Sequence, residues 1–105
     1  MITKYDKLVR DKIPEIIEND GKECTTKKVS GKEKLAYLYK KLSEELKELA
    51  EAESVEELAD VQEVINAIAK ELQISPETLE SVRLSKAIER GAFDSGLVLI
   101  EVKEQ

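Results

Sequence analysis

The sequence predicts a mainly all-α protein, an antiparallel helical bundle with a short N-terminal helix. Residues 32–52 and 54–73 both carry apolar side chains at helical spacing, which indicates two amphipathic helices. A third helix is expected to begin at Ser75 and Pro76, because proline suits the first helical turn, and to stop at Gly91. Only a very short turn separates the two long segments, so we expect them to run antiparallel.

The ends of these helices carry recognisable capping residues. Ser54, followed three residues later by Glu57, is a capping-box pattern and marks the start of the second long helix. Asp11 is the expected N-cap of the short first helix, and Gly21 supplies the turn after it. The expected apolar faces comprise Ile13, Ile16 and Ile17 in the short helix, Leu35, Leu38, Tyr39, Leu42, Leu46 and Leu49 in the first long helix, Leu58, Val61, Ile65, Ile68, Ala69 and Leu72 in the second, and Leu79, Val82, Leu84 and Ile88 in the third.

Two short segments outside the helices have a composition typical of strands. Residues 22–30 contain Thr25, Thr26 and Val29, and residues 97–102 read LVLIEV. We expect these two segments to form a small two-stranded pairing near the termini.

The composition limits the classes of function. The 105 residues predict one domain, 1–105, and the net charge of −6 disfavours binding to nucleic acid or to an anionic membrane. With no histidine and only Cys24, the chain cannot build a Cys/His zinc site or a histidine-dependent catalytic triad. No stretch is long and apolar enough to span a membrane, so we expect a soluble, cytoplasmic protein without a membrane partner.

Four carboxylates lie symmetrically about the turn between the two long helices. Glu45 and Glu48 precede it and Glu57 and Asp60 follow it, each pair spaced i, i+3 and therefore on one side of its helix. An antiparallel hairpin that turns near residues 52–53 would place Glu45 level with Asp60 and Glu48 level with Glu57. Helical projection puts all four at the edge of the helix–helix seam, whereas Glu44 projects to the outer face as a solvated charge.

This acidic cluster predicts a metal site, although a plainer interpretation is open. Acidic residues are frequent here, so i, i+3 pairs also arise by chance, and Glu57 could serve only as the capping-box residue. No lysine or arginine occurs from residue 48 to residue 68, so we expect no nearby basic side chain to neutralise the cluster. A hard dication would remove the repulsion, and Mg²⁺, with Mn²⁺ as a substitute, suits oxygen ligands and phosphate substrates.

These residues resemble a known family signature. Residues 44–48, EELKE, match EExxE, and residues 57–60, ELAD, match ExxD. Together with the flanks KLVRDKIPEII and ERGAFDSGLVLIEV, they resemble the MazG-like all-α nucleoside triphosphate pyrophosphohydrolases, a group that includes phosphoribosyl-ATP pyrophosphohydrolase. Only eight residues separate Glu48 from Glu57, fewer than is usual in the family, so the hinge is tight.

The resemblance implies hydrolysis of the α–β phosphoanhydride of a nucleotide, giving a monophosphate and pyrophosphate. It implies that Mg²⁺ is bound by Glu45, Glu48, Glu57 and Asp60. By the same match Glu44 orients the attacking water or helps to bind a second metal, so that the predicted catalytic residues are Glu44, Glu45 and Glu48. The family builds its sites at dimer interfaces, which implies a homodimer or homotetramer.

Residues in the flanks are candidates for binding the substrate. Arg10 and Lys12 stand at a helix start, and Lys86 and Arg90 lie one turn apart, where they could contact phosphate oxygens or merely complement a helix C-terminus. Asn66 could reach a ribose or base. Two alternatives to general nucleotide hydrolysis stay open: the phosphoribosyl-ATP reaction of histidine synthesis, and a non-enzymatic helical module that dimerises or senses a metal.

Overall fold

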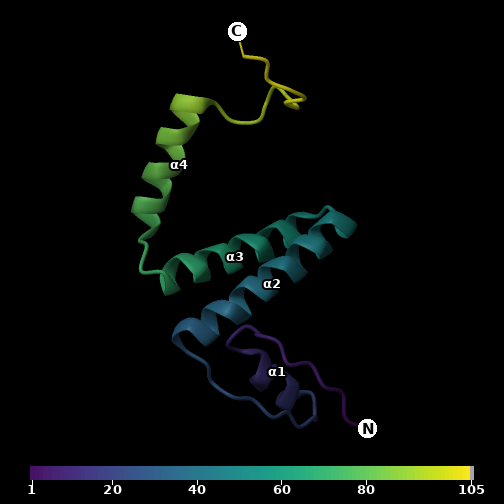
Figure 1. Cartoon of the computed structure of the whole chain (residues 1–105). Coiled ribbons are helices and arrows are strands. Elements are labelled where there is room, and N and C mark those ends of the chain that lie inside the picture. The colour runs from purple at the N-terminus through teal and green to yellow at the C-terminus, as the bar shows by residue number, and fades with distance from the viewer. Residues whose placement is uncertain (105) are drawn as a thin grey trace. The chain divides into compact units, whose positions relative to one another are not determined.

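A computed structural model describes residues 1–104 and confirms the all-α fold class. Four helices follow one another along the chain, and no strand occurs in residues 1–104 (Figure 1). They are α1 (Ile13–Asn19), α2 (Gly31–Ala52), α3 (Val55–Glu71) and α4 (Pro76–Arg90). The chain divides into two compact units, Met1–Ile74 with α1, α2 and α3, and a second that begins at Ser75 and contains α4.

The first unit is built on an antiparallel hairpin of α2 and α3 (Figure 1). Its turn begins at Glu53, which adopts a left-handed conformation (φ 48°, ψ 46°) and donates its backbone N–H to the Leu49 carbonyl at 2.8 Å. Ser54 then caps α3, because its Oγ accepts from the Glu57 N–H at 3.2 Å. At the other end of the hairpin, Lys34 of α2 lies 3.4 Å from Glu71 of α3. The predicted register about residues 52–53 is therefore confirmed.

A small apolar core lies in the seam between α2 and α3. Leu38 is 2% exposed on α2, and Val61 and Val64 are 6% and 8% exposed on α3, with Ala69 also buried. Val61, Val64 and Ile68 follow helical spacing along one side of α3, and Glu57 and Asp60 extend the same side toward the turn. The core therefore ends where the acidic residues begin.

Several apolar residues predicted for the core are exposed instead. Tyr39 and Leu46 on α2 are each 48% exposed, and Leu58, Ile65 and Leu72 on α3 are 56%, 38% and 45% exposed. Within each helix these residues recur every seven positions, so they form a second apolar stripe beside the buried one. In the second unit, α4 buries none of its residues.

Two local expectations are wrong. The N-cap of α1 is Lys12 and not Asp11, and its side chain makes no capping hydrogen bond. The segments 22–30 and 97–102 do not form strands. An isolated two-stranded ribbon is marginally stable in water, and Leu97, which is 90% exposed, illustrates that the second segment has no buried face to stabilise pairing.

Candidate metal centre

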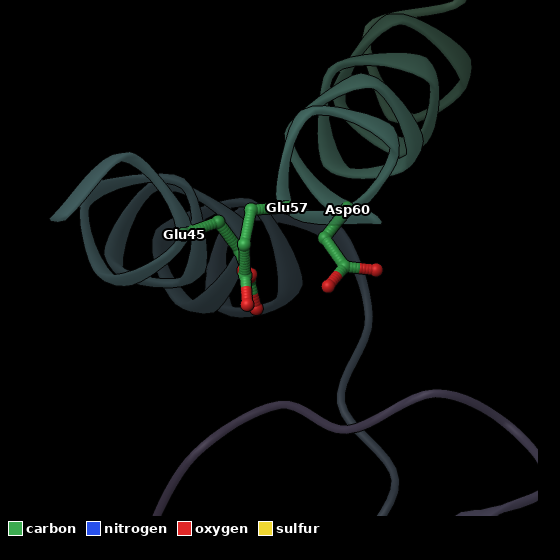
Figure 2. Close-up of side chains that lie close together, drawn as sticks. All are labelled: Glu45, Glu57 and Asp60. Atoms are coloured by element: carbon green, nitrogen blue, oxygen red, sulfur yellow. The ribbon is translucent and has the colours of Figure 1, made fainter. Parts of the chain in front are cut away.

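Three carboxylates converge where the hairpin approaches its turn (Figure 2). Glu45 comes from α2, and Glu57 and Asp60 come from the first two turns of α3, with one oxygen of each within 4.8 Å of the others. Glu45 lies seven residues after Leu38, hence on the side of α2 that faces α3. The Ser54 cap fixes the first turn of α3, which holds the Glu57 backbone in place, and Asp60 lies one turn further on.

Two buried carboxylate oxygens of this cluster have no hydrogen-bond donor within the described residues. Glu45 is only 6% exposed, deeper than the seam-edge position expected for it. Within the described residues, the buried Oε2 atoms of Glu45 and Glu57 accept no hydrogen bond. Because a buried carboxylate oxygen without a donor is costly, these two atoms favour a ligand that supplies positive charge.

The surroundings of Glu57 disfavour its ionised form. Its pKa is raised above the ordinary value of 4.5, first by burial and then by the negative charges of Glu48, Asp60 and Glu45. Protonated Glu57 can donate a hydrogen bond to Glu48, which adds to the increase. A cation among these groups would reverse the effect, because it stabilises the ionised carboxylates.

The predicted fourth ligand, Glu48, stands beside the cluster and not within it. It is exposed, and it does not belong to the three carboxylates whose oxygens converge. Its negative charge nevertheless contributes to the raised pKa of Glu57, and its i, i+3 spacing puts it one helical turn from Glu45. Glu48 is therefore available to a metal ion or to a water molecule at the edge of the site.

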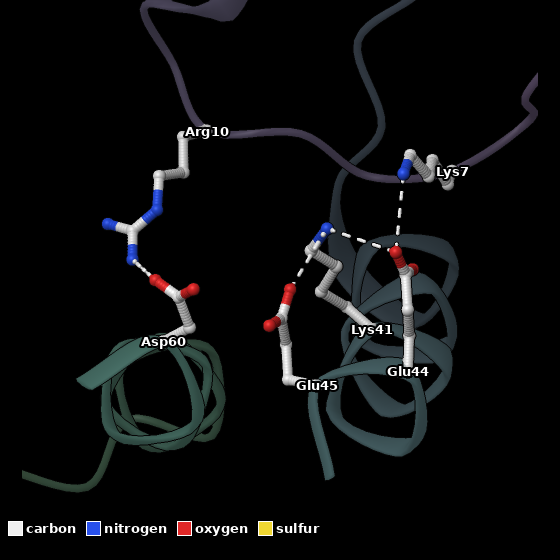
Figure 3. A network of polar contacts seen from close by, with 6 residues as sticks. All are labelled: Lys7, Arg10, Lys41, Glu44, Glu45 and Asp60. Atoms are coloured by element: carbon white, nitrogen blue, oxygen red, sulfur yellow. Dashed lines mark hydrogen bonds and ion pairs between the residues drawn. The ribbon is translucent and has the colours of Figure 1, made fainter. Parts of the chain in front are cut away.

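Basic side chains reach the cluster from outside the 48–68 interval, so the expected lack of basic neighbours is wrong (Figure 3). Lys41 places its Nζ 3.3 Å from Glu45 Oε1, and Arg10 donates to Asp60 Oδ1 at 2.7 Å. Sequence reasoning missed Lys41, although its i, i+4 spacing from Glu45 was the available signal. Arg10 was predicted to bind substrate, and its ion pair with the metal-binding candidate Asp60 was not expected.

Glu44 is not the solvated outer-face charge that helical projection predicts. Its side chain is 34% exposed and its Oε1 lies 3.2 Å from Lys7 Nζ and 3.8 Å from Lys41 Nζ (Figure 3). No sequence signal pointed to Lys7, because it lies 37 residues before its partner. Lys7 and Lys41 thus hold Glu44 beside the cluster, and its role near an attacking water stays a prediction.

The other predicted substrate residues are distributed over both units. Lys12 is exposed at the start of α1. Asn66 is exposed on α3, where its Oδ1 accepts from Gln62 Nε2 at 2.9 Å. Lys86 and Arg90 belong to α4 in the second unit. Their roles in binding phosphate or base stay predictions.

The donor set fits a hard dication. All three side chains offer carboxylate oxygens, and no soft sulfur or imidazole ligand stands among them. In an octahedral Mg²⁺ site with bonds of 2.0–2.1 Å, opposite ligands lie about 4.2 Å apart. The three carboxylate oxygens lie within 4.8 Å of one another, so only a small side-chain adjustment would bring them within reach of one ion.

Comparisons of the chain with protein-family models, with curated proteins and with solved structures give no match. The resemblance to MazG-like enzymes therefore stays a prediction that rests on the two motifs and their flanks. In the part of the chain that the structure describes, no helix is long and apolar enough to cross a membrane.

Proposed function

We propose that this protein hydrolyses the α–β phosphoanhydride of a nucleoside triphosphate or related nucleotide, with Mg²⁺ as its cofactor, and releases a monophosphate and pyrophosphate. The observation that carries the proposal is the convergence of Glu45, Glu57 and Asp60, of which Glu45 is buried with an oxygen that accepts no hydrogen bond within residues 1–104. A dication held by carboxylates can neutralise phosphate charge and activate water without a histidine, and the site offers the carboxylates.

The chain's own residues divide the work in this proposal. Glu45, Glu57 and Asp60 would hold the cation, which when bound neutralises phosphate charge and acidifies water. Glu48 and Glu44 stand at the edge of the three, so either carboxylate can accept the proton of the attacking water. Arg10 contacts the cluster through Asp60. Its guanidinium group suits phosphate oxygens, which it can bind in bidentate fashion.

The direct test is a substrate panel. The protein is incubated with the common ribo- and deoxyribonucleoside triphosphates and with phosphoribosyl-ATP, in Mg²⁺ or in EDTA, and pyrophosphate release is measured. We expect release from at least one substrate in Mg²⁺ and none in EDTA. Preference for phosphoribosyl-ATP would assign the protein to histidine synthesis, whereas no release from any substrate at high protein concentration would contradict the proposal.

A non-enzymatic helical module is the second candidate, favoured by the exposed apolar stripe on α2 and α3. A thermal-shift series separates the two candidates. A ligand that binds only the folded state must raise its stability, so the enzyme should melt at a higher temperature in Mg²⁺ or Mn²⁺. A module without a metal site should melt at the same temperature with and without these ions.

We also propose that the protein is a homodimer or homotetramer that buries the second apolar stripe. Ile65 lies at the centre of the stripe on α3, and Leu46 belongs to its part on α2.

Because a lysine would place a charge in an apolar interface, Ile65→Lys should halve the apparent mass or reduce it further, as measured by sedimentation or light scattering. Glu63→Lys, on the opposite side of α3, should leave the mass unchanged. A wild-type mass of about 12 kDa at roughly 100 μM would contradict the proposal, since stable interfaces are formed far below that concentration.

A further inference from the structure

A short basic segment crosses the open side of the carboxylate cluster. We call residues 6–10 the cationic strap, because Lys7 and Arg10 in it contact Glu44 and Asp60 (Figure 3). Asp6 anchors the strap at one end, where it accepts a hydrogen bond of 2.7 Å from the Tyr37 hydroxyl of α2. This hydrogen bond raises the pKa of Tyr37 above its ordinary value of 10.0.

The contact between the strap and the carboxylate cluster is exposed to solvent. Arg10 and Asp60 form an ion pair whose side chains are 57% and 38% exposed, and exposed pairs contribute little free energy. Lys41, by contrast, is 18% exposed and belongs to the same helix as its partner Glu45. A dication with twice the charge of a guanidinium would therefore displace Arg10 and leave Lys41 in place.

We propose that Arg10 exchanges between two partners, Asp60 in the metal-free protein and a phosphate oxygen of the ligand once a dication occupies Glu45, Glu57 and Asp60. The inference rests on the proposed function. Displacement leaves the guanidinium beside the metal, because the Asp6–Tyr37 hydrogen bond keeps the strap attached to α2. Lys7, released in the same way from Glu44, would add a second positive charge to the same phosphate group.

Exchange of this kind gives one side chain opposite effects on two ligands. In the metal-free state Arg10 competes with the dication, so its removal should strengthen metal binding. In the metal-loaded state Arg10 contacts phosphate, so its removal should weaken binding of the anion. A residue that only stabilises the fold would weaken both. A residue that only adds to the positive potential of the N-terminal segment would give the same two shifts as any other positive charge of that segment.

The test is isothermal titration calorimetry on Arg10→Gln, with Lys4→Gln as the matched control. Lys4 lies in the same N-terminal segment, is exposed and forms no ion pair within residues 1–104, so both variants lose one positive charge. We expect Arg10→Gln to bind Mg²⁺ about two- to fivefold more tightly than wild type, as loss of an exposed ion pair implies. With the protein saturated in Mg²⁺, Arg10→Gln should bind magnesium pyrophosphate about tenfold more weakly or worse, as loss of a charged hydrogen bond implies.

Each outcome bears on the inference. Lys4→Gln should match wild type in both titrations, and equal shifts in the two variants would overturn the exchange in favour of a general charge effect. Unchanged or weaker Mg²⁺ binding by Arg10→Gln, or unchanged pyrophosphate binding, would also overturn it. If wild-type protein binds no dication at all, the proposed function itself fails, and the exchange fails with it. Circular dichroism should show the same helix content in both variants as in wild type.

Discussion

Replacing Glu57 by glutamine should remove the stabilisation of the protein by Mg²⁺ and lower pyrophosphate release by about 100-fold or more, because a catalytic metal supplies several kcal/mol and each ~1.4 kcal/mol is a factor of ten. The same variant should melt at a higher temperature than wild type in EDTA. Glu57 is the carboxylate that burial and the charges of Glu48, Asp60 and Glu45 disfavour most in its ionised form. Glutamine keeps the shape of the side chain and removes the repulsion.

The matched control is Glu56→Gln. Glu56 and Glu57 both lie in the first turn of α3, so both substitutions remove the same favourable interaction with the helix N-terminus. Glu56 is exposed and outside the cluster, so its variant should keep both the Mg²⁺ response and the activity. Thermal melting in EDTA and in Mg²⁺, with the pyrophosphate assay beside it, measures all of these quantities. A Glu57→Gln variant that retains full activity would show that Glu57 is not a ligand.

The raised pKa of Glu57 also fixes the direction of a pH effect. Between the ordinary value of 4.5 and the raised folded-state pKa, the folded protein binds more protons at this site than the unfolded chain. The contribution of Glu57 to the free energy of unfolding is therefore most favourable below pH 4.5, where Glu57 is protonated in both states. It becomes less favourable as the pH rises through the folded-state pKa. In EDTA, the difference in melting temperature between wild type and Glu57→Gln should widen over that interval. A constant difference would contradict the shift.

The sequence was sufficient for the hairpin because local signals agreed along it. Apolar periodicity defined α2 and α3, Ser54 marked a cap that the structure contains, and the short turn left only an antiparallel arrangement. Strand composition failed at residues 97–102, because β structure depends on a partner strand that composition does not specify. The exposed half of the apolar pattern, such as Leu58, could not be separated from the buried half, since one amphipathic helix can have two apolar neighbours.

Only the part of the site that depends on residue spacing within α2 and α3 could be predicted from the sequence. The i, i+3 pairs and their symmetry about the turn correctly brought together Glu45, Glu57 and Asp60. The contacts of Lys7 and Arg10 depend on where the segment before α1 crosses the hairpin, and nothing in the sequence fixes that path. Charge counting within the interval 48–68 therefore missed the basic side chains that the fold brings from residues 7, 10 and 41.

Leu38→Ala should cost about 2–5 kcal/mol of unfolding free energy, the range measured for truncation of a buried leucine. Leu38 is the most buried apolar residue of the structure, 2% exposed, and a domain of this size has only about 5–15 kcal/mol of stability in total. Urea unfolding followed by circular dichroism measures the loss. Leu97→Ala makes the same chemical change at a side chain that is 90% exposed, and it should stay within about 0.5 kcal/mol of wild type.

The response of Leu38→Ala to Mg²⁺ distinguishes a local cavity from a loss of helix register. Leu38 and Glu45 are seven residues apart on the same side of α2, so the packing of one helps to hold the other against α3. If truncation leaves only a cavity, the three carboxylates still converge, and Mg²⁺ at 100 times its Kd should restore about 2.7 kcal/mol, as in wild type. If the helices shift, Glu45 no longer faces Glu57 and Asp60, and the restored free energy falls toward zero. We expect the first result, because the Ser54 cap and the Lys34–Glu71 ion pair fix the two ends of the hairpin independently of Leu38.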